Sequence, residues 1–228
     1  EQGSATVAVR RSHHSGAISV QEAAHAEQGM IALMVANTPA AMAPWGGSKP
    51  VFGTNPIAFA APRAEGDPLV IDLSLSVVAR GKVMHAKKSG TDIPEGWALD
   101  AAGAPTTDPD AALAGAMMPI GGAKGTALAL IGEILAATLT NSTPSAEAAA
   151  FFNPDGPPPG VGQFMLAIKP PDTPGFLQRI EALLTLIEDA PGARLPGSRR
   201  AAALATAHRD GIEVPKHYID VARRLAEG

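Results

Sequence analysis

Short apolar runs separated by polar turns predict β-strands in the first third of the chain and once more near residue 165. Runs of this length, bounded by Gly, Pro or charged residues, are typical of strands within a sheet. We expect the first two to be buried. The predicted strands are Ala5–Val9, Met30–Ala36, Pro56–Ala61, Leu69–Leu73 and Phe164–Ile168.

Longer segments with apolar residues at helical spacing predict helices between and after these strands. Gly29 is expected to end the first of them, and Gly125–Thr140 is apolar on nearly all faces, which predicts a central position. The predicted helices are Ala17–Gln28, Val77–Lys88, Gly125–Thr140, Pro174–Asp189, Arg199–Arg209 and Lys216–Ala226.

Three segments rich in Pro, Gly or turn residues are expected to be loops: Thr38–Asn55, the irregular Thr91–Pro109, and a rigid Asn153–Gly160. The alternation of strands and helices predicts an α/β (mixed α+β) fold, with a mixed sheet and flanking helices in a single domain over residues 1–228. No Gly-x-Gly-x-x-Gly follows a strand, so a Rossmann fold is not supported.

Composition narrows the function classes. The 228 residues are 46% hydrophobic and carry a net charge of −4, with no dense basic cluster, which argues against nucleic-acid binding. The lack of cysteine excludes disulfides, thiolate metal sites and a Cys nucleophile, and fits a cytoplasmic protein. No segment is expected to span a membrane. No metal site is expected either, because the histidines other than His13 and His14 are isolated in the sequence.

The segment from Ser12 to Ala17 is the leading candidate for chemistry, because it places His13 and His14 at the end of a predicted strand. Histidine titrates near neutrality and can transfer a proton without a large pKa shift. Adjacent side chains on a strand point to opposite faces, so at most one of the two is expected to face a given site. The alternative is a surface loop with two ordinary histidines.

Three further segments suit anionic or hydroxyl groups of a ligand. Gly121–Gly125 opens a helix with Lys124, which favours a phosphate, although a flexible lead-in with an exposed lysine is equally consistent. Asp72 ends a strand and could bind a ribose, orient an imidazole or cap the next helix. Ser198 is a candidate N-cap, and the adjacent Arg199 could meet a phosphate.

Taken together, these segments resemble the malate/L-lactate dehydrogenase family of the non-Rossmann type, which includes ureidoglycolate- and sulfolactate-type enzymes and imine-acid reductases. The matching stretches occur in the family's order over nearly the whole chain. They are VAVRRSHHSGA from Val7, ANTPAAMAPWGG from Ala36, GTNPIAFAAP from Gly53, VIDLSLSVVARGKV from Val70, IPEGWALDAAGAPTTDP from Ile93, PIGGAKG from Pro119 and RLPGSRR from Arg194.

The resemblance implies a non-Rossmann NAD(P)-binding fold, with NAD or NADP as cofactor and a small 2-hydroxy acid, or its 2-oxo or imino counterpart, as substrate. It implies a homodimer and assigns His14 as the proton acceptor. The implied cofactor contacts are Thr38, Asp72, Leu73, Ser74, Lys124, Gly197, Ser198 and Arg199.

The chain departs from the family pattern at two places. The family's N-terminal helical segment, with a Ser-His-Gly motif and a following Arg, has no counterpart here, so the chain is expected to be truncated relative to the family. Ala123, Thr126 and Ala127 replace the His and the Tyr-Gly that often flank the Lys-Gly pair. A second hypothesis is therefore a nucleotide-binding fragment or subunit that lacks the substrate-binding segment.

Overall fold

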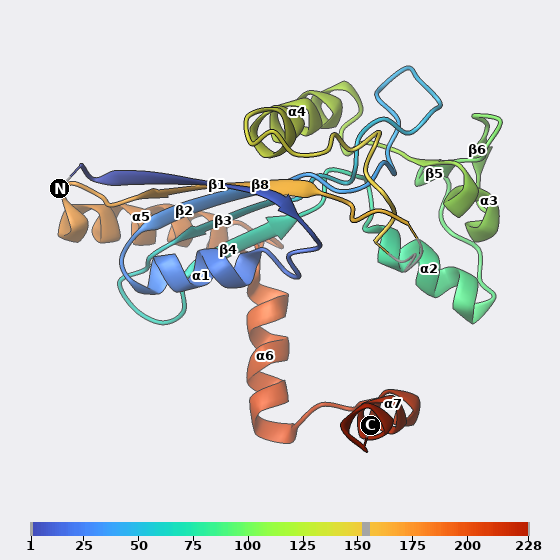
Figure 1. Ribbon diagram of the computed structural model, residues 1–228. Helices are drawn as coiled ribbons and strands as arrows, with labels where there is room; N and C mark the ends of the chain where they lie inside the picture. Colours follow the sequence, from blue (N-terminus) through green and yellow to red (C-terminus); the bar gives the residue numbers. More distant parts are fainter. Residues whose placement is uncertain (1, 152–155, 228) are drawn as a thin grey trace. The chain divides into compact units, whose positions relative to one another are not determined.

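The computed structural model describes residues 2–151 and 156–227. The chain divides into two compact units, Glu1–Leu183 and Leu184–Gly228, and each is described by itself (Figure 1). Helix α5, Thr173–Glu188, begins in the first unit and continues into the second.

The first unit is built on a five-stranded sheet in the order β1-β8-β2-β3-β4. Its strands are β1 (Ser4–Ser12), β2 (Ile31–Ala36), β3 (Ile57–Ala61), β4 (Leu69–Leu73) and β8 (Val161–Ile168). Sheet and helices together confirm the α/β (mixed α+β) class. Neighbouring strands pair antiparallel throughout, so the sheet is antiparallel rather than mixed. Strands β1, β2 and β4 therefore run in one direction. Their C-terminal ends lie along the same border of the sheet, which we call the sheet edge.

Helix α1, Ser19–Glu27, packs on one face of this sheet, and helix α4, Ala123–Glu133, lies on the other side (Figure 1). The buried residues of α1 are Ser19, Glu22 and Ala26. Ala26 packs with Ala60 and Val70, and Ile18 packs with Met34 and Ala58. Helix α1 therefore covers one face of β2, β3 and β4.

A second core lies beyond the sheet, around a three-stranded antiparallel sheet of two-residue strands. Its largest buried side chains include Met42, Leu75, Val83 and Met117, with Trp97 packed against them. The elements of this region are helices α2 (Arg80–Ser89) and α3 (Pro109–Ala114) and strands β5 (Ala98–Leu99), β6 (Pro105–Thr106) and β7 (Ala116–Met117). The sequence indicated only α2 here.

Helix α5 is anchored to the β3–β4 turn by a two-pronged ion pair. Arg63 Nη2 and Nε donate to the Glu181 oxygens at 2.8 and 3.2 Å, and the Ala64 amide donates to Glu181 at 3.0 Å. These hydrogen bonds lower the pKa of Glu181 below its usual value.

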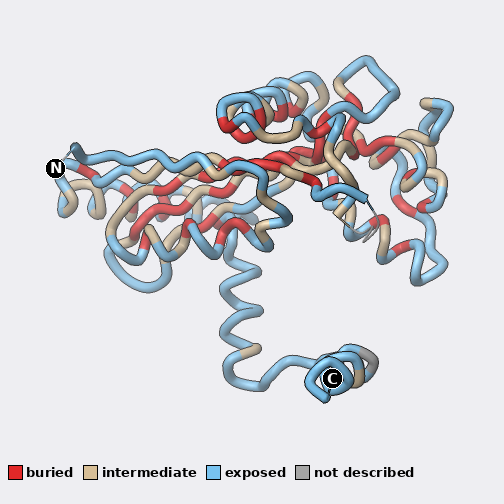
Figure 2. Tube along the Cα trace, in the orientation of Figure 1, coloured by how far each residue is buried: buried red, intermediate tan, exposed pale blue. Residues whose placement is uncertain are grey.

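In the second unit, α6 (Ser198–Asp210) has no buried residue, and α7 (Lys216–Glu227) is also largely exposed (Figure 2). The apolar side chains of α7 are exposed as well: Tyr218, Ile219, Val221 and Leu225.

Two sequence-based expectations about burial are wrong. Strand β1 is an outermost strand of the sheet, and all its residues except Val9 and Ser12 are exposed. The apolar helix at residues 125–140 is not central, because Ile131 and Ile134 are about half exposed, at 51% and 49%.

Small residues explain the orientation of this helix. The buried residues of α4 are Gly125, Ala129 and Gly132. A Cβ at Gly125 would lie 2.1 Å from the Ile120 carbonyl oxygen in the turn before the helix, and one at Gly132 would lie 3.6 Å from Asn55 Cβ. The large side chains of the helix consequently face outward. The helix also changes to a π-helix at Ile134–Thr138. The predicted rigid loop Asn153–Gly160 falls partly outside the described residues.

Candidate cofactor-binding site

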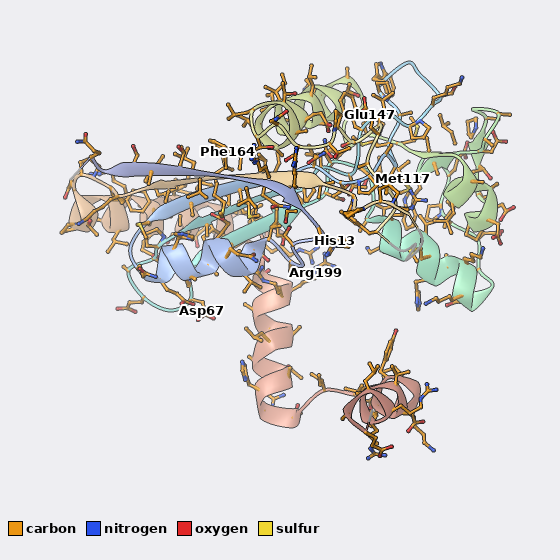
Figure 3. The ribbon with its side chains drawn as sticks, in the orientation of Figure 1. His13, Asp67, Met117, Glu147, Phe164 and Arg199 are labelled. Atoms are coloured by element: carbon orange, nitrogen blue, oxygen red, sulfur yellow. The ribbon has the colours of Figure 1, made fainter. Side chains whose placement is uncertain are left out.

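Most of the predicted site residues of the first unit gather at one edge of the main sheet. His14 follows the end of β1, Thr38 follows β2, and Asp72, Leu73 and Ser74 stand at the end of β4. Because these three strands run in the same direction, their ends meet at this edge. Figure 3 shows His13 where β1 ends.

A chain of hydrogen bonds ties the beginning of α4 to the same edge. The Thr54 amide donates to Thr38 Oγ1 at 3.0 Å, and the Leu75 amide donates to the Thr54 carbonyl at 2.8 Å. The Ile120 amide in turn donates to the Leu75 carbonyl at 2.8 Å. The turn that leads to Lys124 is thus fixed beside Thr38 and Ser74.

The start of α4 combines two glycines with an exposed lysine. Gly121 and Gly122 have φ of 59° and 62°, a conformation that a side chain would strain. A Cβ at Gly122 would lie 3.1 Å from the Trp45 ring, whereas the one at Gly121 would meet only Lys124 Cβ at 3.9 Å. The Gly122 and Lys124 amides already donate to the Pro119 and Gly121 carbonyls, so the exposed Lys124 side chain at the N-terminus of this 11-residue helix is the charged donor suited to a phosphate.

His13 and His14 were expected to point to opposite faces of a strand, and this expectation is wrong. The strand ends at Ser12, and both rings lie beside Phe151, with centroid distances of 5.1 and 5.2 Å. The Gly16 amide donates to His14 Nδ1 at 3.1 Å. With Nδ1 as acceptor, the neutral ring carries its proton on Nε2. Since His14 is exposed, this N–H can reach a ligand.

A β-bulge, which the sequence analysis did not predict, precedes the two histidines. Val9 pairs with Gln163 and Ser12 with Val161, so Arg10 and Arg11 together oppose one residue of β8. Arg11 has φ of 53°, and its amide donates to Ser142 Oγ at 3.2 Å. Bulges redirect the residues that follow them, so this one sets the path of the chain into His13 and His14.

Asp72 caps a helix, but not the next one along the chain. Its Oδ2 accepts a hydrogen bond from the Ser19 amide at 3.2 Å, at the start of α1. Helix α2 has Ala79 as its N-cap and no side-chain cap. The Asp72 side chain is exposed, so it remains accessible to a ligand hydroxyl at the sheet edge.

Glu22 is a feature of α1 that the sequence analysis missed. It is 1% exposed and packed against the sheet, and neither of its carboxyl oxygens has a hydrogen-bond partner among the described residues. Burial raises the pKa of Glu22 above its usual 4.5, and the nearby His25 opposes this effect. A polar residue at a core-facing helical position was the available signal.

Three predicted cofactor contacts belong to the second unit. Helix α6 begins at Ser198, and Gly197, with φ of 83°, is its N-cap. The expectation that Ser198 is the N-cap is therefore wrong, because the left-handed backbone at Gly197 takes that position. Arg199 is exposed in the first turn of α6.

In the part of the chain that the structure describes, no helix is long and apolar enough to cross a membrane. No group of three His, Cys, Asp or Glu residues in that part could hold a metal ion.

The comparisons with known proteins identify the class. Residues 1–221 match the malate/L-lactate dehydrogenase family. The chain belongs to this family of oxidoreductases, and the resemblance inferred from its motifs is confirmed.

Individual relatives fall into two groups by their names. The chain is 52% identical over 227 residues to the (2R)-3-sulfolactate dehydrogenase (NADP(+)) of Chromohalobacter salexigens, covering 99% of this chain and 68% of that protein. It is 43% identical over 220 residues to a Δ(1)-pyrroline-2-carboxylate/Δ(1)-piperideine-2-carboxylate reductase of Pseudomonas aeruginosa, covering 94% and 66%. The chain thus spans about two thirds of these relatives.

Solved structures agree on the fold. Δ1-Piperideine-2-carboxylate reductase from Pseudomonas syringae superposes with a TM-score of 0.90 at 39% identity, covering 98% of this chain and 68% of that one. Sulfolactate dehydrogenase from Methanocaldococcus jannaschii gives 0.84 at 33% identity, covering 94% and 64%.

Proposed function

We propose that the protein is an NAD(P)-dependent oxidoreductase that transfers a hydride between the nicotinamide and C2 of a small 2-hydroxy acid, or its 2-oxo or imino counterpart. One observation carries the proposal. The sheet edge brings together Thr38, the end of β4 and the turn before Lys124, three expected cofactor contacts, with His14 at the same edge.

The chain's own groups divide the binding between them. Lys124 would hold the cofactor diphosphate, and the exposed Asp72 carboxylate would accept a hydrogen bond from a ribose hydroxyl. Gly197, Ser198 and Arg199, which belong to the second unit, stay predictions that rest on the family resemblance alone. The nicotinamide, when bound, supplies or accepts the hydride.

His14 would handle the proton. In reduction, His14 must begin as the imidazolium. Its Nε2 gives a proton to the substrate oxygen or imine nitrogen while C2 gains the hydride, and the ring becomes neutral with its remaining proton on Nδ1. Oxidation reverses both transfers, and Nε2 then begins without its proton. Because Nδ1 carries a proton in both directions, the Gly16 amide, which donates to Nδ1, must turn away before His14 can transfer a proton.

The proposed substrates follow the names of the relatives, a sulfolactate on one side and cyclic imino acids on the other. Both groups carry a carboxylate beside the reacting carbon. We include NADP beside NAD, because a 52% identical relative is named for NADP(+). A homodimer in the cytoplasm completes the proposal, and sedimentation equilibrium tests its oligomeric part.

A panel of 2-oxo acids and cyclic imino acids, each with NADH and with NADPH, tests the proposal. We expect oxidation of the reduced cofactor with at least one of the substrates. Cofactor binding by calorimetry without turnover of any substrate would favour the nucleotide-binding fragment instead. Absence of cofactor binding would contradict both hypotheses.

A further inference from the structure

A partly buried polar cluster lies at the end of α4, outside the residues expected to contact the cofactor. It consists of Glu133, Asn55 and Ser145, and the last two are 0% exposed. The Ser145 amide donates to Glu133 Oε1 at 2.6 Å. The Ser145 hydroxyl and Asn55 Nδ2 donate to Glu133 Oε2 at 2.6 and 2.9 Å. Three donors therefore converge on one carboxylate.

The carboxylate determines how the Asn55 amide is turned. On the nitrogen side, Asn55 Nδ2 faces two acceptors, Glu133 and the Ala129 carbonyl at 3.2 Å. On the other side, Asn55 Oδ1 accepts a hydrogen bond from the Thr38 amide at 3.3 Å. An amide with its nitrogen held by acceptors must present its oxygen to Thr38.

Thr38 is held from its other side as well. A Cβ at Gly53 would lie 2.2 Å from both the carbonyl oxygen and Oγ1 of Thr38, so only glycine allows the two segments to approach this closely. The preceding Asn37 is bonded to the amide of Gly162 at 2.8 Å and to the carbonyl of Thr143 at 3.0 Å. Asn55 itself has φ of 30°, which is rare outside glycine.

We propose that Glu133 is a positioning residue for cofactor binding, which acts through the Asn55 amide to fix Thr38 at the sheet edge. The inference rests on the proposed function, because it takes Thr38 as a cofactor contact. It also explains why α4 carries Lys124 in its first turn and Glu133 at its end. Helix α4 then contacts the cofactor directly through Lys124. Through Glu133 it also positions the loop that carries Thr38.

The test measures the dissociation constants of NADH and NADPH by calorimetry on the purified protein, together with thermal unfolding. Glu133→Gln replaces one of the two acceptor oxygens by an NH₂ donor, so the three donors can no longer all be satisfied and the Asn55 amide is no longer held in one orientation. We expect about tenfold weaker cofactor binding. Glu147→Gln is the matched control, because Glu147 (Figure 3) is exposed in the same region and loses the same charge. It is expected to bind within about twofold of the parent.

A double-mutant cycle separates positioning from general stability. If Glu133 acts through Thr38, Glu133→Gln combined with Thr38→Ala binds no more than about twofold weaker than the weaker single variant. Should Glu133→Gln fail to fold, Ser145→Ala replaces it in the same cycle. It removes the hydroxyl that donates to Glu133 Oε2 at 2.6 Å and lies 3.4 Å from Asn55 Oδ1.

The outcomes are distinguishable. Parent protein that binds neither cofactor contradicts the proposed function and this inference with it. Parent protein that binds, with Glu133→Gln unchanged or with the two single effects multiplying in the double variant, contradicts the inference alone. Coupled effects with an unchanged Glu147→Gln support it.

Discussion

Individual residues at the sheet edge differ in how readable their roles were from the sequence. His14 and Lys124 stood out because each follows a recognisable pattern, a strand end and a glycine-rich helix start. Glu133 and Asn55 did not, because they are 78 residues apart in the chain and only the fold brings them into contact. Polar partners at such separations have no local signal.

His14→Ala is expected to lower turnover by at least about 10²-fold, with little change in cofactor affinity, because it removes the proton-transfer group and no proposed cofactor contact. Steady-state kinetics and calorimetry check the two parts. His13→Ala is the control, since it removes the neighbouring ring that also lies beside Phe151. Turnover of His14→Ala within a few-fold of the parent would make His14 structural.

Lys124→Ala is expected to weaken NAD(P) binding by roughly 1.5–3 kcal/mol, the scale of a charge-assisted hydrogen bond. Calorimetry measures the change, with Lys88→Ala as control because Lys88 is exposed in the last turn of a different helix. Unchanged affinity would return Lys124 to the role of an exposed surface lysine.

Glu22→Gln is expected to stabilise the protein at pH 7. Burial raises the pKa of Glu22 in the folded state above 4.5, so the ionised side chain destabilises the fold as the pH rises above that value. The gain should be on the order of 1 kcal/mol at pH 7 and vanish near pH 4. Urea unfolding at both pH values tests this, with the exposed Glu27→Gln on the same helix as control. An equal effect at both values would refute the charge argument.

At the scale of elements, the five strands of the main sheet were predicted with small errors at their ends, because a strand in a sheet needs a continuous or alternating apolar run. Strands β5, β6 and β7 were missed, since two residues have no periodicity. Helix α3 was missed although Asp108 caps it and Pro109 begins it, which are recognisable start signals. Burial was predicted less well than secondary structure, because an apolar pattern does not show which side of α4 packs against the rest of the protein.

Gly125→Ala tests how closely the start of α4 packs against the turn before it. The added methyl would lie 2.1 Å from the Ile120 carbonyl oxygen, so we expect a loss of about 1–3 kcal/mol in the free energy of unfolding. Gly81→Ala in α2 is the control, because its methyl would meet nothing within 4 Å. It should be neutral or slightly stabilising. Equal effects of the two substitutions would show that close approach is not the cause.

At the scale of the whole molecule, the fold class and the family followed from the sequence, because motifs spread over the chain match in order. The antiparallel arrangement of the sheet did not, although it is what brings the ends of β1, β2 and β4 to one edge. Pairing order depends on contacts between distant segments, such as β1 with β8, whose paired residues run from Ser4 with Ile168 to Ser12 with Val161. The site is thus a product of topology rather than of any one motif.

The central claim is that this edge supports hydride transfer to C2 of a small acid. Reduction of a 2-oxo or cyclic imino acid with NADH or NADPH in which both hydrogens at nicotinamide C4 are deuterium, followed by mass spectrometry and NMR of the product, tests it most directly. We predict a 2-hydroxy or cyclic amino acid with deuterium at C2, whose formation slows sharply in His14→Ala. A protein that binds the cofactor and yields no product, or a product without deuterium at C2, would contradict the account.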